Sequence, residues 1–345
     1  MAEDPPLAEP PRAHGEPPLR ARLRAAPEDF RVRETINFAL EGAGEHVWLR
    51  VRKRDANTEW VARRLAERAG VSAGAVGYAG LKDRRAVTEQ WFSVHLPGRP
   101  EPDWNGGEGD DFRVLEAVRH SRKLRRGALS GNAFRIVARE IEGDPAELAR
   151  RLRRIAENGA PNYFGEQRFG REGGNLERAE ALLRGEESAR DRHRRGLYLS
   201  AARSALFNAV LARRVVRGDW NRPLPGETLM LDGSHSIFTA TEPDAAIHRR
   251  VAELDLHPTG PLWGAGELPC EGQARELERA VAADWPIFRD GLAAQGLRQE
   301  RRALRLRVGD AALDWPDPAT AVLRFHLPAG AYATTVLREL FRSTD

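Results

Sequence analysis

The chain of 345 residues is 41% hydrophobic and 31% charged, which is typical of a globular protein with a substantial core and favours two domains. It has no run of about 18 apolar residues and no basic, apolar export signal at its start, so we expect a cytoplasmic protein without a membrane-spanning helix. Its one cysteine, Cys270, excludes an internal disulfide and any multi-cysteine metal site.

Arginine carries nearly all of the positive charge. The formal net charge is +4, and all but three of the 55 basic residues are arginine. Basic runs recur at residues 20–24, 50–54, 119–126, 150–154, 190–195 and 298–307. Any one run could be a solvated helix face, but together they favour a polyanionic partner such as RNA.

The chain opens with a proline-rich segment and continues with short strands. Residues 1–20 contain repeated prolines and almost no aliphatic pattern, so we predict a disordered leader. After it, several stretches alternate with a period close to two, as antiparallel strands with one buried face should. These stretches are residues 30–34, 47–52, 112–115, 134–139 and 322–327.

Two helices have clear start and stop signals. One opens at Thr58 and stops at Gly70. The other has Asp144 as its cap, Pro145 as its first residue and Gly159 as its stop. Strands mixed irregularly with helices predict an α+β fold and not a doubly wound one.

The middle of the chain has a different pattern of predicted secondary structure. After residue 159 long stretches become helical, and residues 200–216 form the clearest helix. Clear alternation returns only near residues 304–308 and 322–327. A segment inserted into one α+β domain explains this order as well as two consecutive domains would.

Several common kinds of site are excluded. Residues 74–82 contain glycines and a lysine but lack the Gly-Lys-Ser/Thr ending of a phosphate loop. The histidines show no metal-ligand spacing, and no nucleophile elbow occurs. We therefore do not expect a bound metal.

The stretch GYAGLKDRRAVTEQW, residues 77–91, places Asp83 between Lys82 and Arg84 in a glycine-rich turn that leads into a strand. Adjacent cations would keep this carboxylate ionised as an RNA phosphate approaches. The pattern by itself favours a solvated turn and leaves catalysis as the minority interpretation.

Two further segments combine basic and aromatic residues. Residues 119–134 join a basic loop to Asn132 and Phe134 at the start of a strand, as in a phosphate-contacting loop. Residues 327–340 form a strand end, a glycine turn and a terminal helix. Tyr332 at that turn is either a core residue or an aromatic that stacks on a base.

Taken together, these segments resemble the TruD family of tRNA pseudouridine synthases. The matching elements run in the family's order from about residue 20 to the C-terminus. They are residues 26–30, 80–91, 122–134, 161–170, 200–208 and 327–340.

The resemblance implies an isomerase that converts the uridine at position 13 of tRNA to pseudouridine without a metal or cofactor. It implies a pseudouridine synthase α+β domain with a mixed, mainly antiparallel sheet and a largely helical TRUD insertion. The catalytic domain would comprise residues 21–157 and 306–345, and the insertion residues 158–305. A monomer that binds tRNA is expected.

The resemblance also assigns site residues. Asp83 matches the family's catalytic aspartate, which acts at the ribose C1′ or removes a ribose proton. Phe30, Asn132 and Tyr332 match positions that hold the substrate nucleotide. Phe134 matches an active-site aromatic.

Two positions depart from the family pattern. Arg24 stands where some members have lysine, and its planar fork could bind Asp83 through two hydrogen bonds. Tyr332 stands where some have phenylalanine, and its hydroxyl needs a partner if it is buried. Two other functions stay open on the residues themselves: an inactive tRNA-binding or RNA-folding protein, and a hydrolase that releases free uracil from nucleosides.

Overall fold

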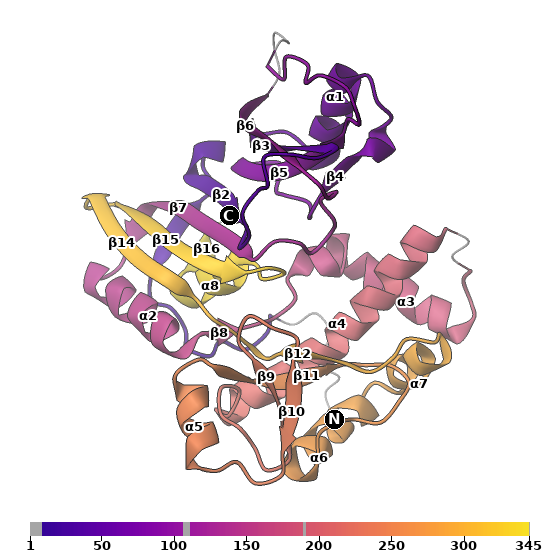
Figure 1. Cartoon of the computed structure of the whole chain (residues 1–345). Coiled ribbons are helices and arrows are strands. Elements are labelled where there is room, and N and C mark those ends of the chain that lie inside the picture. The colour runs from indigo at the N-terminus through magenta and orange to yellow at the C-terminus, as the bar shows by residue number, and fades with distance from the viewer. Residues whose placement is uncertain (1–8, 106–110, 189–190, 345) are drawn as a thin grey trace. The chain divides into compact units, whose positions relative to one another are not determined.

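The computed structural model describes residues 9–105, 111–188 and 191–344 (Figure 1). Contacts between residues divide the chain into two compact units. Unit 1 comprises residues 1–17, 151–307 and 332–340, and unit 2 comprises residues 18–150, 308–331 and 341–345. The second unit is therefore built from segments that are far apart in the sequence.

Unit 2 is organised around a mixed, mainly antiparallel sheet with the strand order β14-β15-β7-β2-β5-β3-β6. Short strands β1, β16 and β4 join it beside this path, and the β2–β5 and β1–β16 pairs are parallel. The strands are β1 (Arg20–Leu23), β2 (Phe30–Thr35), β3 (His46–Arg54), β4 (Val76–Tyr78), β5 (Val87–His95), β6 (Phe112–His120), β7 (Gly131–Glu142), β14 (Gly309–Asp317), β15 (Thr320–Pro328) and β16 (Arg342–Thr344). The predicted α+β class with a mainly antiparallel sheet is confirmed.

Helix α1 (Thr58–Ala69) covers part of one face of this sheet. It begins and ends where the sequence predicted, because Gly70 takes the left-handed conformation (φ 59°) that terminates helices. Its buried side chains Val61 and Leu65 belong to one apolar cluster with Val51 of β3 and Phe92 of β5. This packing fixes the first turn of α1 beside the strands that carry the candidate site.

Unit 1 is mainly helical. Its longest helix, α4, carries buried apolar residues of the cluster that forms the core of this unit. The helices assigned mainly to this unit are α2 (Pro145–Asn158), α3 (Gly174–Arg184), α4 (Arg192–Arg217), α5 (Ala245–Ala252), α6 (Gly272–Ala283), α7 (Pro286–Ala294) and α8 (Ala333–Leu340). In the described parts of the chain, no helix is long and apolar enough to cross a membrane.

Unit 1 also contains a four-stranded sheet that the sequence did not predict. Its order is β10-β9-β11-β12, and a separate pair joins β8 to β13. The strands are β8 (Ala160–Pro161), β9 (Glu227–Leu231), β10 (Ile237–Ala240), β11 (Leu256–Leu262), β12 (Glu300–Ala303) and β13 (Arg305–Leu306). Strand β11, LHPTGPL, is buried along most of its length and interrupted by two prolines and a glycine, so it shows no period-two alternation.

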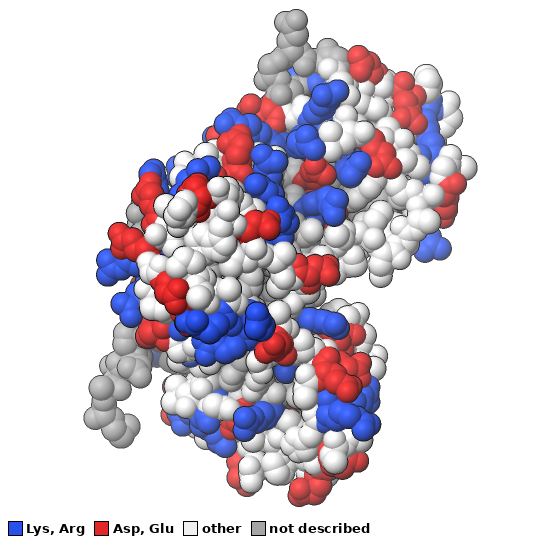
Figure 2. Space-filling view, turned by 90° about the vertical axis from the view of Figure 1, so that its left-hand side faces the viewer, with Lys and Arg blue, Asp and Glu red and all other residues white. Residues whose placement is uncertain are grey.

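Charged residues of both signs occur together on the surface. On the face in Figure 2, lysine and arginine side chains are interspersed with aspartate and glutamate. This face therefore carries no uniform basic patch, although the basic runs are numerous in the sequence.

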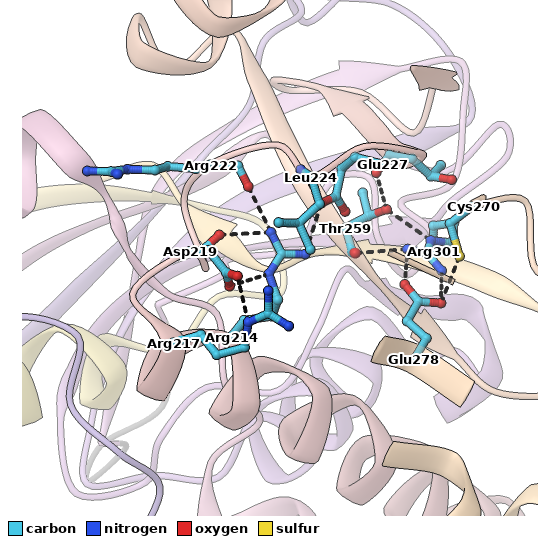
Figure 3. A network of polar contacts seen from close by, with 11 residues as sticks. Arg214, Arg217, Asp219, Arg222, Leu224, Glu227, Thr259, Cys270, Glu278 and Arg301 are labelled. Atoms are coloured by element: carbon cyan, nitrogen blue, oxygen red, sulfur yellow. Dashed lines mark hydrogen bonds and ion pairs between the residues drawn. The ribbon is translucent and has the colours of Figure 1, made fainter. Parts of the chain in front are cut away.

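Some arginines lie in the interior of unit 1. Arg214 contacts Glu227 at 2.9 Å, and Arg301 contacts Glu278 at 2.7 Å and donates to the Thr259 carbonyl at 2.8 Å (Figure 3). Both arginines and both glutamates are buried. These guanidinium groups are used within the fold and are not available to a polyanion.

The segment before β1 contacts other parts of unit 1. Arg338 of α8 donates to the carbonyl of Pro11 at 3.4 Å, and Arg151 of α2 donates to the carbonyl of Gly15 at 3.1 Å. Such charge-assisted hydrogen bonds hold the backbone of residues 9–17 against the helices.

These contacts bear on the predicted disordered leader, residues 1–20. Within it, the backbone carbonyls of Pro11, Gly15 and Glu16 accept hydrogen bonds from arginines of two helices. Residues 1–8 lie outside the described part of the chain.

Candidate active site

Asp83 lies on a loop of unit 2 between β4 and β5. The Gln90 side chain donates to the carbonyl of Gly80 at 2.9 Å, and the backbone N–H of Lys82 donates to the Thr58 hydroxyl at 3.1 Å. That hydroxyl in turn donates to the Gln90 side chain at 2.9 Å. The loop that carries Asp83 is thus tied to both β5 and the first residue of α1.

Two cations bind Asp83 directly. Arg24 donates from Nη2 to Oδ2 of Asp83 at 3.1 Å, with each side chain about one-third exposed (33%). Lys53 donates from Nζ to the backbone carbonyl of Asp83 at 3.0 Å and to that of Ala56 at 2.7 Å. Lys53 is only 1% exposed, and burial lowers its pKa to about 8. The carboxylate of Asp83 remains accessible, while the buried ammonium of Lys53 holds the backbone of the same residue.

An aromatic stack supports Arg24. Its guanidinium lies over the ring of Phe30, 4.1 Å from the centroid, which is a cation–π contact. The Phe30 ring meets Phe134 edge-on at 6.1 Å, and Phe134 stacks on Phe325 at 5.4 Å. Arg24 itself has a positive φ of 57°, an unfavourable conformation for a residue with a side chain. The stack and the ion pair offset that cost and orient the guanidinium toward Asp83.

A buried ion pair lies next to this loop. The Nζ of Lys82 lies 2.7 Å from Oε1 of Glu34, whose side chain is fully buried, and the backbone N–H of Trp91 donates to Oε2 at 2.7 Å. Burial raises the pKa of Glu34, while the positive charge of Lys82 opposes that rise. The pair fixes the lysine that directly precedes Asp83 in the chain.

We expected Lys82, Arg84 and Arg85 to form the electrostatic setting of Asp83. In the structure Lys82 pairs with Glu34, and the guanidinium of Arg84 lies 3.6 Å from the carboxylate of Asp55. Sequence neighbours of a turn residue point in different directions, so adjacency in the chain did not predict the partner. The cation that binds the carboxylate is Arg24, as the sequence analysis expected.

Asn132 lies on β7, opposite Glu34 of β2. It is 8% exposed, and its buried Oδ1 has no hydrogen-bond partner in the described protein. Because residues two apart on a strand share a face, Asn132 and Phe134 lie on the same side of the sheet. An acceptor left unsatisfied in the interior costs free energy unless a ligand or water satisfies it.

Tyr332 belongs to unit 1, where it directly precedes α8. Its hydroxyl accepts a hydrogen bond from Nη2 of Arg168 at 3.4 Å, and Nη1 of Arg168 donates to the hydroxyl of Ser200 at 3.0 Å. The tyrosine hydroxyl therefore has the partner that partial burial requires. Five predicted site residues, Asp83, Arg24, Phe30, Phe134 and Asn132, belong to unit 2.

The sequence analysis did not identify Glu34, Lys53, Thr58 and Gln90 as parts of the site. A signal was present for two of them: Glu34 and Lys53 occupy inward positions of strands whose other inward residues are apolar. Charged residues are almost never fully buried unless they are paired, so such positions deserve notice in a sequence. Thr58 and Gln90 gave no comparable signal.

Cys270 is not a candidate nucleophile. Its thiol is buried in unit 1 and hydrogen-bonds Glu278, and burial raises its pKa to about 12. A thiol in that state is a poor nucleophile.

No group of three or more His, Cys, Asp or Glu side chains that could hold a metal ion occurs among the described residues.

Comparison with known proteins identifies the family of this chain. The family model described as tRNA pseudouridine synthase D (TruD) matches residues 12–192 and 187–340. Proteins named tRNA pseudouridine synthase D from Nitrosococcus oceani and Methylococcus capsulatus are 52% and 51% identical to the chain, each over 96% of it and 93% of the relative. A crystal structure from Methanosarcina mazei with a provisional TruD assignment superposes with a TM-score of 0.75 at 26% identity, over 96% of this chain and 95% of that one. The chain therefore belongs to the TruD family of tRNA pseudouridine synthases.

Proposed function

We propose that this protein converts a uridine in tRNA, at position 13, to pseudouridine, with Asp83 as the catalytic carboxylate. In this isomerisation the bond between ribose C1′ and uracil N1 breaks, and the uracil is rejoined through its C5 carbon. The C5 hydrogen leaves as a proton and N1 gains one, so no oxidant or reductant is needed. Asp83 acts on the ribose side, as a nucleophile at C1′ or as a base toward a ribose proton.

One observation carries the assignment of Asp83. Its carboxylate is partly exposed and bonded to Arg24, while the loop beneath it is tied down at Gly80, Lys82 and Asp83 itself. A carboxylate used only as a turn acceptor does not require a buried ammonium and an aromatic-supported arginine. Rigid placement of an accessible, ionised group is what catalysis at a bound ribose needs.

We further propose that the other predicted site residues hold the nucleotide. The unsatisfied Oδ1 of Asn132 is suited to accept from a uracil N–H, and Tyr332 offers a ring for stacking. Phe30 and Phe134 are 2% and 8% exposed, so we propose that they act mainly from behind the nucleotide: Phe30 supports Arg24, and Phe134 packs against Phe30. A uridine in folded tRNA must leave its stack to reach them, at a cost of about a few kcal/mol.

The domain assignment follows from the same reasoning. We propose that residues 21–157 and 306–345 form the pseudouridine synthase domain and that residues 158–305 form the TRUD insertion. The two units follow this division in outline, but residues 151–157, 306–307 and 332–340 belong to unit 1 by their contacts. The long helical stretch between the two halves of the unit 2 sheet supports this division. Cytoplasmic location and a monomeric state remain our expectations, and sedimentation of the purified protein tests the latter.

The first experiment compares wild-type protein with Asp83→Asn. Each is incubated with an unmodified tRNA transcript, and pseudouridine is located by chemical labelling. We expect modification at position 13 by the wild type and a drop of at least about 10³-fold in rate for Asp83→Asn, because the amide cannot act as nucleophile or base. Binding of the transcript should change little.

Three results would contradict the proposal in different ways. Full activity of Asp83→Asn would remove the carboxylate from the mechanism. Tight binding without modification by the wild type would favour the inactive RNA-binding protein. Release of free uracil would favour the hydrolase.

A further inference from the structure

The three lysines of this protein share a location. Every other basic residue is arginine, yet Lys53, Lys82 and Lys123 all contact or belong to the stretch of chain that leads to Asp83. Lys123 donates to the carbonyl of Gly74 at 2.6 Å, at the start of that stretch. A compact ammonium with three rotatable donors fits a group of backbone carbonyls better than a planar guanidinium does. Among the three lysines, Lys53 is the one whose ammonium binds the backbone of Asp83 itself.

Lys53 is the most deeply buried of the three. On β3 the inward positions before it are apolar, and Val51 is fully buried; Lys53 takes the next inward position at 1% exposure. Its neighbours Arg52 and Arg54 are exposed and paired with glutamates. Burying an ammonium costs about several kcal/mol, and an apolar side chain at this position would avoid that cost. Stability therefore does not explain the lysine.

The contacts of Lys53 end on the backbone of Asp83. Its Nζ bridges the carbonyl of Ala56, just beyond β3, to the carbonyl of Asp83. Arg24, which directly follows β1, binds the carboxylate of Asp83. One cation thus fixes the main chain of Asp83 and a second fixes its side chain, while the bonds at Gly80 hold only the start of the loop.

The charges around Lys53 come from several elements. The carboxylates of Asp83, Glu34 and Asp55 favour its protonated form, and the ammonium of Lys82 opposes it. Burial outweighs these contributions and lowers the pKa of Lys53 to about 8. The group is therefore charged at neutral pH and becomes neutral as the pH rises through about 8.

We infer that Lys53 is a positioning residue for the isomerisation, acting through the backbone of Asp83. The inference rests on the proposed role of Asp83. Lys53 touches neither substrate nor reacting atoms; it keeps the carboxylate at the distance from the ribose that the reaction requires. A displacement of about 1 Å at a reacting group can cost roughly 100-fold in rate.

The test is Lys53→Met, which removes the charge and the donors but keeps an unbranched side chain. Turnover is followed by tritium release from tRNA that carries uridine labelled at C5, since the C5 hydrogen leaves on isomerisation. We expect kcat to fall by roughly 100-fold with KM changed by less than about 3-fold. The melting temperature should change little, because removal of the buried charge offsets the loss of the donor to the carbonyls of Ala56 and Asp83.

Arg52→Met is the matched control. It removes a cation from the adjacent, outward position of the same strand, and its kcat should stay within about 2-fold of the wild type. Asp83→Asn is assayed alongside. Should Asp83→Asn stay active, the proposed role of Asp83 fails, and the present inference fails with it. Should only Lys53→Met stay active, the present inference fails by itself.

A pH profile provides a readout that a purely structural role would not change. For the wild type, kcat/KM reports on the free enzyme and should decline as the pH rises through about 8, when Lys53 loses its proton. Lys53→Arg stays charged over this range and should lack that decline, whatever its plateau. The inference would be overturned by any of three results. The first is a wild-type kcat/KM that stays flat to about pH 9.5, and the second is a decline that persists unchanged in Lys53→Arg. The third is an effect of Lys53→Met that is confined to KM.

Discussion

At the scale of single residues, the ion pair of Glu34 and Lys82 shows how the site is held in place. The Glu34 carboxylate has no exposed surface, forms an ion pair with the Lys82 ammonium and accepts a hydrogen bond from the backbone N–H of Trp91. Desolvation makes such a pair a weak source of net stability, but removing one partner leaves a charge stranded in the interior. The pair therefore specifies where Lys82, and with it Asp83, must lie.

Lys82→Met should lower the free energy of unfolding by about 3–5 kcal/mol, because Glu34 would then be buried without its cation. The double variant Glu34→Gln/Lys82→Met should recover most of that stability, since no charge remains. Urea denaturation of the wild type and both variants measures the difference. If Lys82→Met lowers the free energy of unfolding by less than about 1 kcal/mol, the ion pair is more hydrated than this structure indicates.

At the scale of elements, the N-terminal segment and α8 depend on each other. The guanidinium of Arg338 lies 5.6 Å from the ring centroid of Tyr163, and Arg338 donates to the carbonyls of Pro10 and Pro11. The backbone N–H of His14 donates to Glu339 at 3.0 Å. The short helix α8 thus has partners along the segment that precedes β1, and it begins directly after Tyr332.

Arg338→Ala should destabilise the protein by about 1–3 kcal/mol, because it removes the guanidinium donor to the carbonyl of Pro10 and one of two donors to the carbonyl of Pro11. The N-terminal segment should also become more sensitive to limited proteolysis, because one of its attachments to α8 is lost. Arg307→Ala is a suitable control, because it removes an exposed ion pair with Asp232 and should cost at most about 1 kcal/mol. Equal effects of the two variants would show that the segment adds nothing to the stability of α8.

At the scale of the whole molecule, the arginines fall into two classes. Arg214, Arg301 and Arg305 are buried and bonded within unit 1. Arg125 and Arg126 lie exposed in the basic loop before β7. Only the second class can contact RNA phosphate, so the number of basic residues in the sequence overstates the surface open to tRNA.

The logarithm of the association constant for tRNA should fall linearly with the logarithm of salt concentration, because phosphate contacts release counterions. Replacing Arg125 or Arg126 by alanine should weaken binding and reduce the slope by about 1 for each phosphate that is no longer neutralised. Arg289→Ala is the control, since Asp290 already engages that guanidinium at 2.7 Å. A salt response that is flat for the wild type would argue against electrostatic binding of the RNA.

Much of the local structure followed from the sequence. The limits of α1 were predicted to the residue because Gly70 gives a clear stop, and the inward and outward residues of β2 and β3 followed from their alternation. The sheet of unit 1 was not predicted from the sequence, because β11 is buried on both faces and contains prolines. A buried strand without alternation resembles any other short apolar run.

The amino-acid sequence was sufficient to identify the family, the α+β class and Asp83 as the candidate carboxylate, because these depend on motifs and periodicities that are local in the chain. The family resemblance already pointed to Arg24 as the cation on the carboxylate. The folded structure was needed to find the other partners, which are Lys53 on the backbone of Asp83 and Glu34 beside Lys82. Period-two alternation indicates which residues face inward, but not which strands become neighbours or in what register. The parallel pairing of β2 with β5 and the antiparallel pairing of β3 with β5 set those contacts, and only folding creates them.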